Sequence, residues 1–120
     1  MKIFVADDYE NFRILLADVL RHDGEEVREF RDGATLLSAV LAEAPDIVVA
    51  ELRLPVITAL DVLVTLRARN VRVPMIVTTS VAPEDFSVDR AHHGPVRVLR
   101  KPFVVDQLRS VMSEILKSER

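Results

Sequence analysis

Five short apolar segments recur along this chain, and each is followed by a stretch in which apolar residues have helical spacing. The segments cover residues 2–6, 26–30, 47–51, 75–79 and 96–99. Strands that are apolar along their whole length are typical of a parallel sheet covered by helices on both faces. The second segment mixes charged and apolar residues, so this strand is expected toward an edge. The alternation predicts five βα units in one doubly wound α/β sheet.

The stretches between these segments predict five helices. Four are expected over residues 11–22, 60–69, 84–92 and 104–117, and another runs from Asp32-Gly33 to a point before Pro45. The chain has no linker and no low-complexity tract, so a single domain over residues 1–120 is expected. In the first helix, five apolar residues recur at spacings that place them on one face: Phe12, Leu15, Leu16, Val19 and Leu20.

Composition limits the compartment and the class of partner. The chain has no cysteine, which excludes disulfides and thiolate chemistry. No apolar run approaches about 18 residues, so no membrane span is expected and a cytoplasmic protein is the simplest interpretation. The net charge is −3 and the basic residues form no dense run, so this domain is not expected to bind nucleic acid.

Polar residues with metal-binding or phosphate-binding chemistry stand at the ends of the predicted strands. Asp7 and Asp8 follow the first strand, Glu51 ends the third, and Lys101 follows the fifth. Because ligands of doubly wound sheets bind beyond the carboxyl ends of the strands, we expect these side chains to form one site. The alternatives are helix N-terminal acids at 7 and 8, favoured by the helix dipole, and solvated strand ends at 51 and 101.

Sequence patterns of the common nucleotide-binding and hydrolase sites are absent. The three glycines are isolated, so there is no G-x-G-x-x-G motif and no Walker loop. The chain also lacks the G-x-S-x-G pattern of a nucleophile elbow. We therefore expect a binding domain that is not an enzyme and that requires no cofactor.

Four motifs, taken in order, resemble a response-regulator receiver domain over essentially the whole chain. They are VADD at 5–8, PDIVVAELRLP at 45–55, VPMIVTTS at 73–80 and KPF at 101–103. The first motif alone is weakly specific, whereas the four together at this spacing are strongly specific. The resemblance implies a flavodoxin-like fold with strand order 2-1-3-4-5 and a role in two-component signalling.

The resemblance also implies a metal and phosphate site. Glu51 stands where the family has the aspartate that accepts a phosphoryl group from a histidine kinase. Asp7 and Asp8, together with position 51, would hold Mg²⁺, and the backbone carbonyl of Arg53 would complete the protein ligands. Such oxygen ligands suit a hard cation, so weak Mg²⁺ binding stays open although no cofactor is required.

The implied switch residues belong to the fourth and fifth strands. Thr79 matches the hydroxyl residue that moves toward the phosphoryl group, with Ser80 beside it, and Lys101 matches the lysine that pairs with that group. The resemblance suggests a cis Lys101-Pro102 bond. Val98 stands where the family usually has an aromatic switch residue, and it has no ring to move.

Three departures from the family lie along this switching route. Glu51 replaces the acceptor aspartate, Val98 replaces the ring, and residues 56–59 replace a turn that usually contains glycine. One added methylene moves a carboxylate by roughly 1 Å, and such a displacement can cost about 10²-fold in rate. The sequence therefore predicts an atypical receiver, a pseudo-receiver that acts as a phosphorylation-independent protein-interaction module. A phosphoacceptor response regulator and a metal- or pH-sensing switch are the alternatives.

Arginines gather in the last two βα units of the chain. Receiver domains commonly dimerise or contact partners in this region. The resemblance therefore predicts a homodimer or an acidic protein partner at a surface that contains Arg90, Arg97, Arg100 and Arg109.

Overall fold

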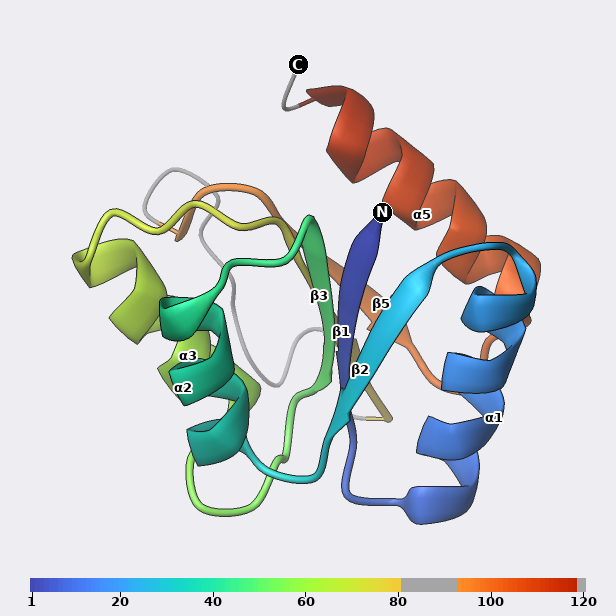
Figure 1. The fold of residues 1–120 in the computed structure, drawn as a ribbon, viewed down its shortest axis with the longest axis horizontal. Helices are drawn as coiled ribbons and strands as arrows, with labels where there is room; N and C mark the ends of the chain where they lie inside the picture. Colours follow the sequence, from blue (N-terminus) through green and yellow to red (C-terminus); the bar gives the residue numbers. More distant parts are fainter. Residues whose placement is uncertain (81–92, 119–120) are drawn as a thin grey trace.

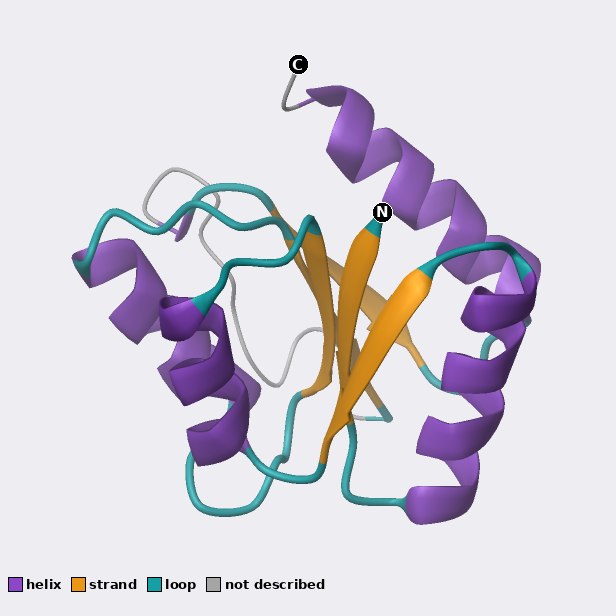
Figure 2. Ribbon diagram, viewed as in Figure 1, coloured by secondary structure: helices purple, strands orange, loops and turns teal. Residues whose placement is uncertain are grey.

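The computed structural model describes residues 1–80 and 93–118. A five-stranded parallel sheet runs through its middle (Figure 2). The strand order is β2-β1-β3-β4-β5. This order confirms the predicted doubly wound, flavodoxin-like sheet and the edge position of the second strand. The strands are β1 (Lys2–Ala6), β2 (Glu26–Phe30), β3 (Ile47–Glu51), β4 (Met75–Thr79) and β5 (Val96–Arg100).

Helices cover both faces of the sheet, with α2 and α3 on one side and α1 and α5 on the other (Figure 1). The bounds of α1, α3 and α5 agree with the predicted ones to within one residue, and α2 ends before Pro45 as expected. The helix predicted over 84–92 lies outside the described residues. None of the helices in the described ranges has the length and hydropathy of a membrane span. The helices are α1 (Glu10–His22), α2 (Gly33–Ala42), α3 (Ala59–Ala68) and α5 (Val105–Ser118).

Each face of the sheet has its own hydrophobic core, because side chains alternate along every strand. On β1, for example, Phe4 points into the core under α2 and α3, whereas Ile3 and Val5 point into the core under α1 and α5. Within the first core the Phe4 and Phe30 rings pack with centroids 4.9 Å apart. The same alternation of side chains determines the face of the sheet on which each polar residue beyond a strand end lies.

Side-chain caps fix where two of the helices begin. The Asp32 carboxylate accepts a hydrogen bond of 2.7 Å from the Thr35 backbone N–H at the start of α2. At the start of α3, Thr58 and Asp61 form a capping box, in which each side chain accepts from the other residue's backbone at 3.1 Å. These bonds satisfy N–H groups that have no partner inside the helix.

The buried face of α1 differs from the predicted one. Leu15, which the helical spacing placed on the buried face, is 63% exposed, so that prediction is wrong. The buried positions are 13, 16, 17 and 20, which follow the i, i+3, i+4, i+7 pattern and begin with an arginine. Arg13 is only 4% exposed. The helix is turned so that a cation, and not a leucine, begins its buried stripe.

The loop between β3 and α3 contains a tight, strained turn. Val56 has φ 72°, and the Ile57 backbone N–H donates a hydrogen bond of 2.9 Å to the Pro55 carbonyl. A γ-turn with positive φ is the rarer form, and it is costly for a β-branched residue. Gly33 lies so close that a Cβ atom there would stand 2.0 Å from the Ile57 carbonyl oxygen. The loop that follows Glu51 is therefore packed tightly onto the start of α2.

Candidate functional site

The carboxyl ends of β1 and β3 bring two carboxylates together. Val5 and Val49 are register partners and both point into the core under α1 and α5. Asp7 and Glu51 each lie two residues further along, so they emerge on this same face as neighbours. Both are largely buried, with side chains 3% and 11% exposed respectively. The sheet register, which is set by apolar residues, thus creates a pair of buried acids.

Lys101 brings a cation to both of these acids. Its Nζ atom lies 2.8 Å from Asp7 Oδ2 and donates a hydrogen bond to it. The same Nζ atom lies 2.8 Å from Glu51 Oε2, which is an ion-pair distance, although the angles of a hydrogen bond are not met. That Glu51 oxygen is buried and has no hydrogen-bond partner. The three side chains form an ion triad of two carboxylates and one ammonium, here called the Lys101 triad.

An aromatic pair supports the lysine from the side of α1. The Lys101 ammonium lies 4.3 Å from the centroid of the Phe12 ring, within the range of a cation–π contact. Phe12 in turn packs edge-on against Phe103, with centroids 5.8 Å apart and the rings at 87°. The Lys101 backbone N–H donates to the Thr79 carbonyl at 2.7 Å, and the Lys101-Pro102 bond is cis, as the resemblance suggested.

The electrostatics of the triad favour a charged lysine. Burial by itself lowers the pKa of Lys101, but the hydrogen bond to Asp7 and the close negative charges of Asp7 and Glu51 together outweigh it and raise this pKa. Because an opposite charge at hydrogen-bond distance favours the ionised form, the ammonium is retained at neutral pH.

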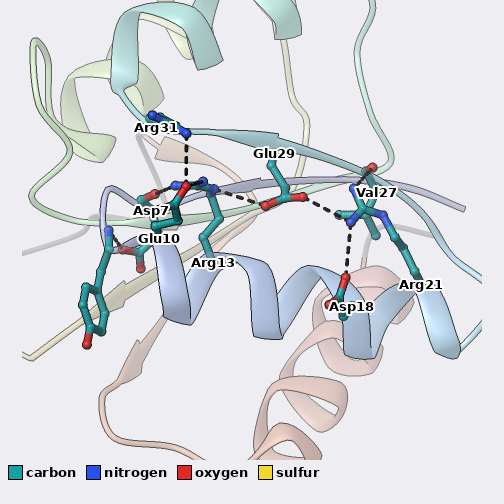
Figure 3. A network of polar contacts seen from close by, with 9 residues as sticks. Asp7, Glu10, Arg13, Asp18, Arg21, Val27, Glu29 and Arg31 are labelled. Carbon is teal, nitrogen blue, oxygen red and sulfur yellow. Dashed lines mark hydrogen bonds and ion pairs between the residues drawn. The ribbon is translucent and has the colours of Figure 1, made fainter.

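Arg13 on α1 holds the backbone at Asp7, a role that the sequence did not directly indicate (Figure 3). Its Nη1 atom donates to the Asp7 carbonyl at 3.0 Å, and its Nε atom donates to Glu29 at 3.2 Å. Glu10 lies 3.8 Å away as a second acid. In the sequence, Arg13 precedes Leu16 by three positions and Leu20 by seven, which is the spacing of residues on one helix face and could have indicated that Arg13 is buried. The network continues through ion pairs of Arg21 with Asp18 and Glu29 and of Arg31 with Glu10.

The predicted metal ligands do not assemble into a metal site. Asp8 is exposed, whereas Asp7 is buried and bound to Lys101. In the described part of the chain, no three His, Cys, Asp or Glu side chains gather closely enough to hold a metal ion. Arg53 is exposed as well. The residues present do not fit Mg²⁺ in this arrangement, because an ammonium group already lies between the two buried carboxylates.

The predicted switch residues occupy different environments. Thr79 is fully buried, and Val98 is half-buried on β5 beside its register partner Val77. The residue paired with Glu51 across β3 and β4 is Thr78, which is also buried. Ser80 is exposed. It lines an open pocket of about 360 Å³, together with Tyr9, Phe12, Lys101, Pro102 and Phe103.

The predicted interface arginines do not form one surface within the described residues. Arg90 lies outside those residues. Arg97 and Arg100 are three positions apart on β5, so alternation directs them to opposite faces of the sheet. Arg109 is tied to its own chain, because it forms two bonds of 2.9 and 3.0 Å with Asp23 and one of 2.8 Å with Asp106.

Comparisons with known proteins agree with this geometry. The chain is 25% identical over 115 residues to sporulation initiation phosphotransferase F of Bacillus subtilis, covering 96% of this chain and 93% of that protein. It is 30% identical over 116 residues to the transcriptional regulatory protein PrrA of Mycobacterium bovis, covering 97% of this chain and 50% of that protein. With the regulator NtrC of Escherichia coli it shares 29% identity over 105 residues, covering 88% of this chain and only 22% of NtrC.

Solved structures and a family model also match this chain to response regulator receiver domains. The receiver domain of the Francisella response regulator 1452 superposes with a TM-score of 0.87 at 22% identity, covering 99% of this chain and 98% of that one. The receiver domain of NtrX from Brucella abortus gives a TM-score of 0.83 at 26% identity, covering 96% and 98%. The model of the response regulator receiver domain matches residues 3–113. The chain therefore belongs to the response regulator receiver domain family of two-component signalling.

Proposed function

We propose that this receiver domain acts by binding a protein partner, without accepting a phosphoryl group at position 51 and without catalytic activity of its own. One observation carries the proposal. Glu51, at the acceptor position, is already buried in ion contact with the lysine that the resemblance assigns to the phosphoryl group, at 2.8 Å.

The geometry at position 51 is unfavourable for phosphoryl transfer. A glutamate places its carboxylate roughly 1 Å beyond that of an aspartate, and a displacement of that size can cost about 10²-fold in rate. The carboxylate oxygen nearest Lys101 is also buried, so it is not presented to an incoming phosphodonor. Both features act against phosphorylation of Glu51.

The state of the domain is fixed by a permanent charge. An ionised carboxylate brings a single negative charge, whereas a phosphoryl group brings about −1.5 to −2. Val98 offers no ring that could move inward in response to either charge. A domain with this site keeps one conformation and presents one surface to its partner.

The partner is a protein of two-component signalling, of the kind that receiver domains bind, such as a histidine kinase or an effector domain. Arg100 is exposed, and no ion pair joins it to another residue in the described ranges, so it is the arginine of the predicted surface best placed to meet an acidic partner. Sedimentation analysis of the wild type and of Arg100→Glu tests for a homodimer through this surface. Loss of a wild-type dimer in the variant supports it.

The deciding experiment exposes the protein to acetyl phosphate with Mg²⁺ and follows its intact mass. We expect no gain of about 80 Da, the mass of one phosphoryl group, over times in which a control receiver with an acceptor aspartate is fully modified. Glu51→Gln serves as the internal control, because it removes the carboxylate and keeps the side-chain length. A rapid, stoichiometric gain that is present in the wild type and lost in Glu51→Gln would show a working phosphoacceptor and refute the proposal.

A further inference from the structure

Both oxygens of the Asp7 carboxylate have partners inside the protein. Oδ1 accepts a hydrogen bond of 2.9 Å from the Tyr9 backbone N–H, and Oδ2 accepts one of 2.8 Å from Lys101. The Asp7 backbone is fixed as well, because its N–H donates to the Phe30 carbonyl at 3.0 Å and its own carbonyl accepts from Arg13. This carboxylate is held in one orientation, which points at Lys101.

Lys101 is held equally firmly at the other end of the contact. Its backbone N–H is bound to β4 through Thr79, and its ammonium contacts both carboxylates and the Phe12 ring. A buried carboxylate requires a nearby positive charge or a set of hydrogen bonds. The ammonium meets that requirement for both acids at once, since it lies 2.8 Å from an oxygen of each.

We propose that the Lys101 ammonium is the resident cation of the Asp7 and Glu51 carboxylates and takes the place of a divalent metal ion in this receiver. A magnesium ion would need oxygen ligands at about 2.0–2.1 Å in octahedral geometry, with several waters retained. The two carboxylates are instead spaced around a nitrogen at 2.8 Å, and the third candidate ligand, Asp8, is exposed.

The inference is separate from the proposed lack of phosphorylation. A receiver that cannot be phosphorylated could still bind Mg²⁺, and a metal-free site could still be tested with a phosphodonor. Phosphate on Glu51 would therefore overturn the proposed function, whereas Mg²⁺ binding by the wild type would overturn only the resident-cation inference.

The test is a titration with MgCl₂ followed by backbone amide NMR. For the wild type we expect no saturable shift at Asp7, Asp8 or Glu51 up to about 20 mM, well above the dissociation constants of weak protein sites near about 10⁻³ M. For Lys101→Met we expect saturable shifts at these three residues, because two buried acids are left without a cation. The dissociation constant for Mg²⁺ should be at least about tenfold below the highest concentration tested with the wild type.

Matched variants separate this effect from a change in total charge. Lys117→Met removes one positive charge from the last turn of α5, and it is expected to behave like the wild type. Lys101→Gln is neutral yet still donates hydrogen bonds, and it is expected to gain Mg²⁺ binding in case the methionine variant does not fold. Saturable binding by the wild type at these residues, or its absence in a folded Lys101 variant, would overturn the inference. If neither variant folds, the wild-type titration decides.

Discussion

The guanidinium of Arg13 donates a hydrogen bond of 3.0 Å to the backbone carbonyl of Asp7, which ties the buried stripe of α1 to the acid that holds Lys101. The same guanidinium pairs with Glu29 on β2 at 3.2 Å. One buried arginine therefore joins the first helix, the edge strand and the functional site (Figure 3).

Replacing Arg13 with methionine is expected to lower the free energy of unfolding by about 1–3 kcal/mol, because a buried carbonyl and an acid lose their charged donor. Urea denaturation measures this change. Arg21→Met is the matched control, since Arg21 pairs with the same Glu29 from an exposed position. We expect that variant to lose less than about 1 kcal/mol. Equal losses in the two variants would contradict a special role for Arg13.

Shortening Glu51 to aspartate is expected to restore phosphorylation. The carboxylate withdraws from Lys101 by roughly 1 Å and regains the acceptor position, so the rate should rise by about 10²-fold or more over the wild type. Intact mass after treatment with acetyl phosphate and Mg²⁺ measures the gain. An unmodified Glu51→Asp variant would mean that side-chain length is not what blocks the reaction.

A phosphorylated Glu51→Asp variant would also show whether phosphorylation at position 51 changes the surface of β5 and α5. We expect amide shifts to stay confined to the site, because Val98 has no ring with which to carry a change to the surface of β5 and α5. Chemical-shift mapping before and after phosphorylation measures this spread. Shifts that extend over α5 would show that coupling does not require an aromatic residue at position 98.

Replacing Val56 with glycine is expected to stabilise the fold. Its φ of 72° costs a β-branched residue of order 1–3 kcal/mol, whereas glycine adopts this angle freely but loses about 0.5–1 kcal/mol in entropy. A net gain of about 1 kcal/mol should appear in urea denaturation. Val104→Gly is the control, because this valine is also exposed but is not among the residues with positive φ. Stabilisation of both variants would argue against relief of strain.

The contribution of Lys101 to stability should depend on pH in one direction. Burial lowers the pKa of Lys101, but the two carboxylates outweigh it and raise the folded-state pKa above the ordinary value of 10.5. The stabilisation is therefore fully present below about pH 10.5 and is lost as the pH rises through the folded-state pKa. The difference in unfolding free energy between wild type and Lys101→Met should stay constant near neutral pH and shrink as the pH rises above 10.5. A difference that grows with pH would contradict the ion triad.

The sequence by itself determined the sheet. Strands β1 to β4 have the bounds that their short segments predict, because the apolar runs at β1, β3 and β4 have no other way to be buried than between two layers of helices. The edge position of β2 followed from its mixed charges. The placement of Asp7, Glu51 and Lys101 at one edge also followed, since parallel strands end on the same side.

Only the tertiary structure decided what those residues do there. Helical spacing counted Leu15 as buried and overlooked Arg13, because apolar patterning does not show which way a helix turns about its axis or that an arginine will find buried carbonyl and acid partners. The family resemblance likewise grouped Asp7, Asp8 and Glu51 as metal ligands. In the structure Asp8 is exposed, whereas Asp7 and Glu51 are buried. The Lys101 ammonium lies 2.8 Å from an oxygen of each buried acid, because buried carboxylates require a nearby positive charge.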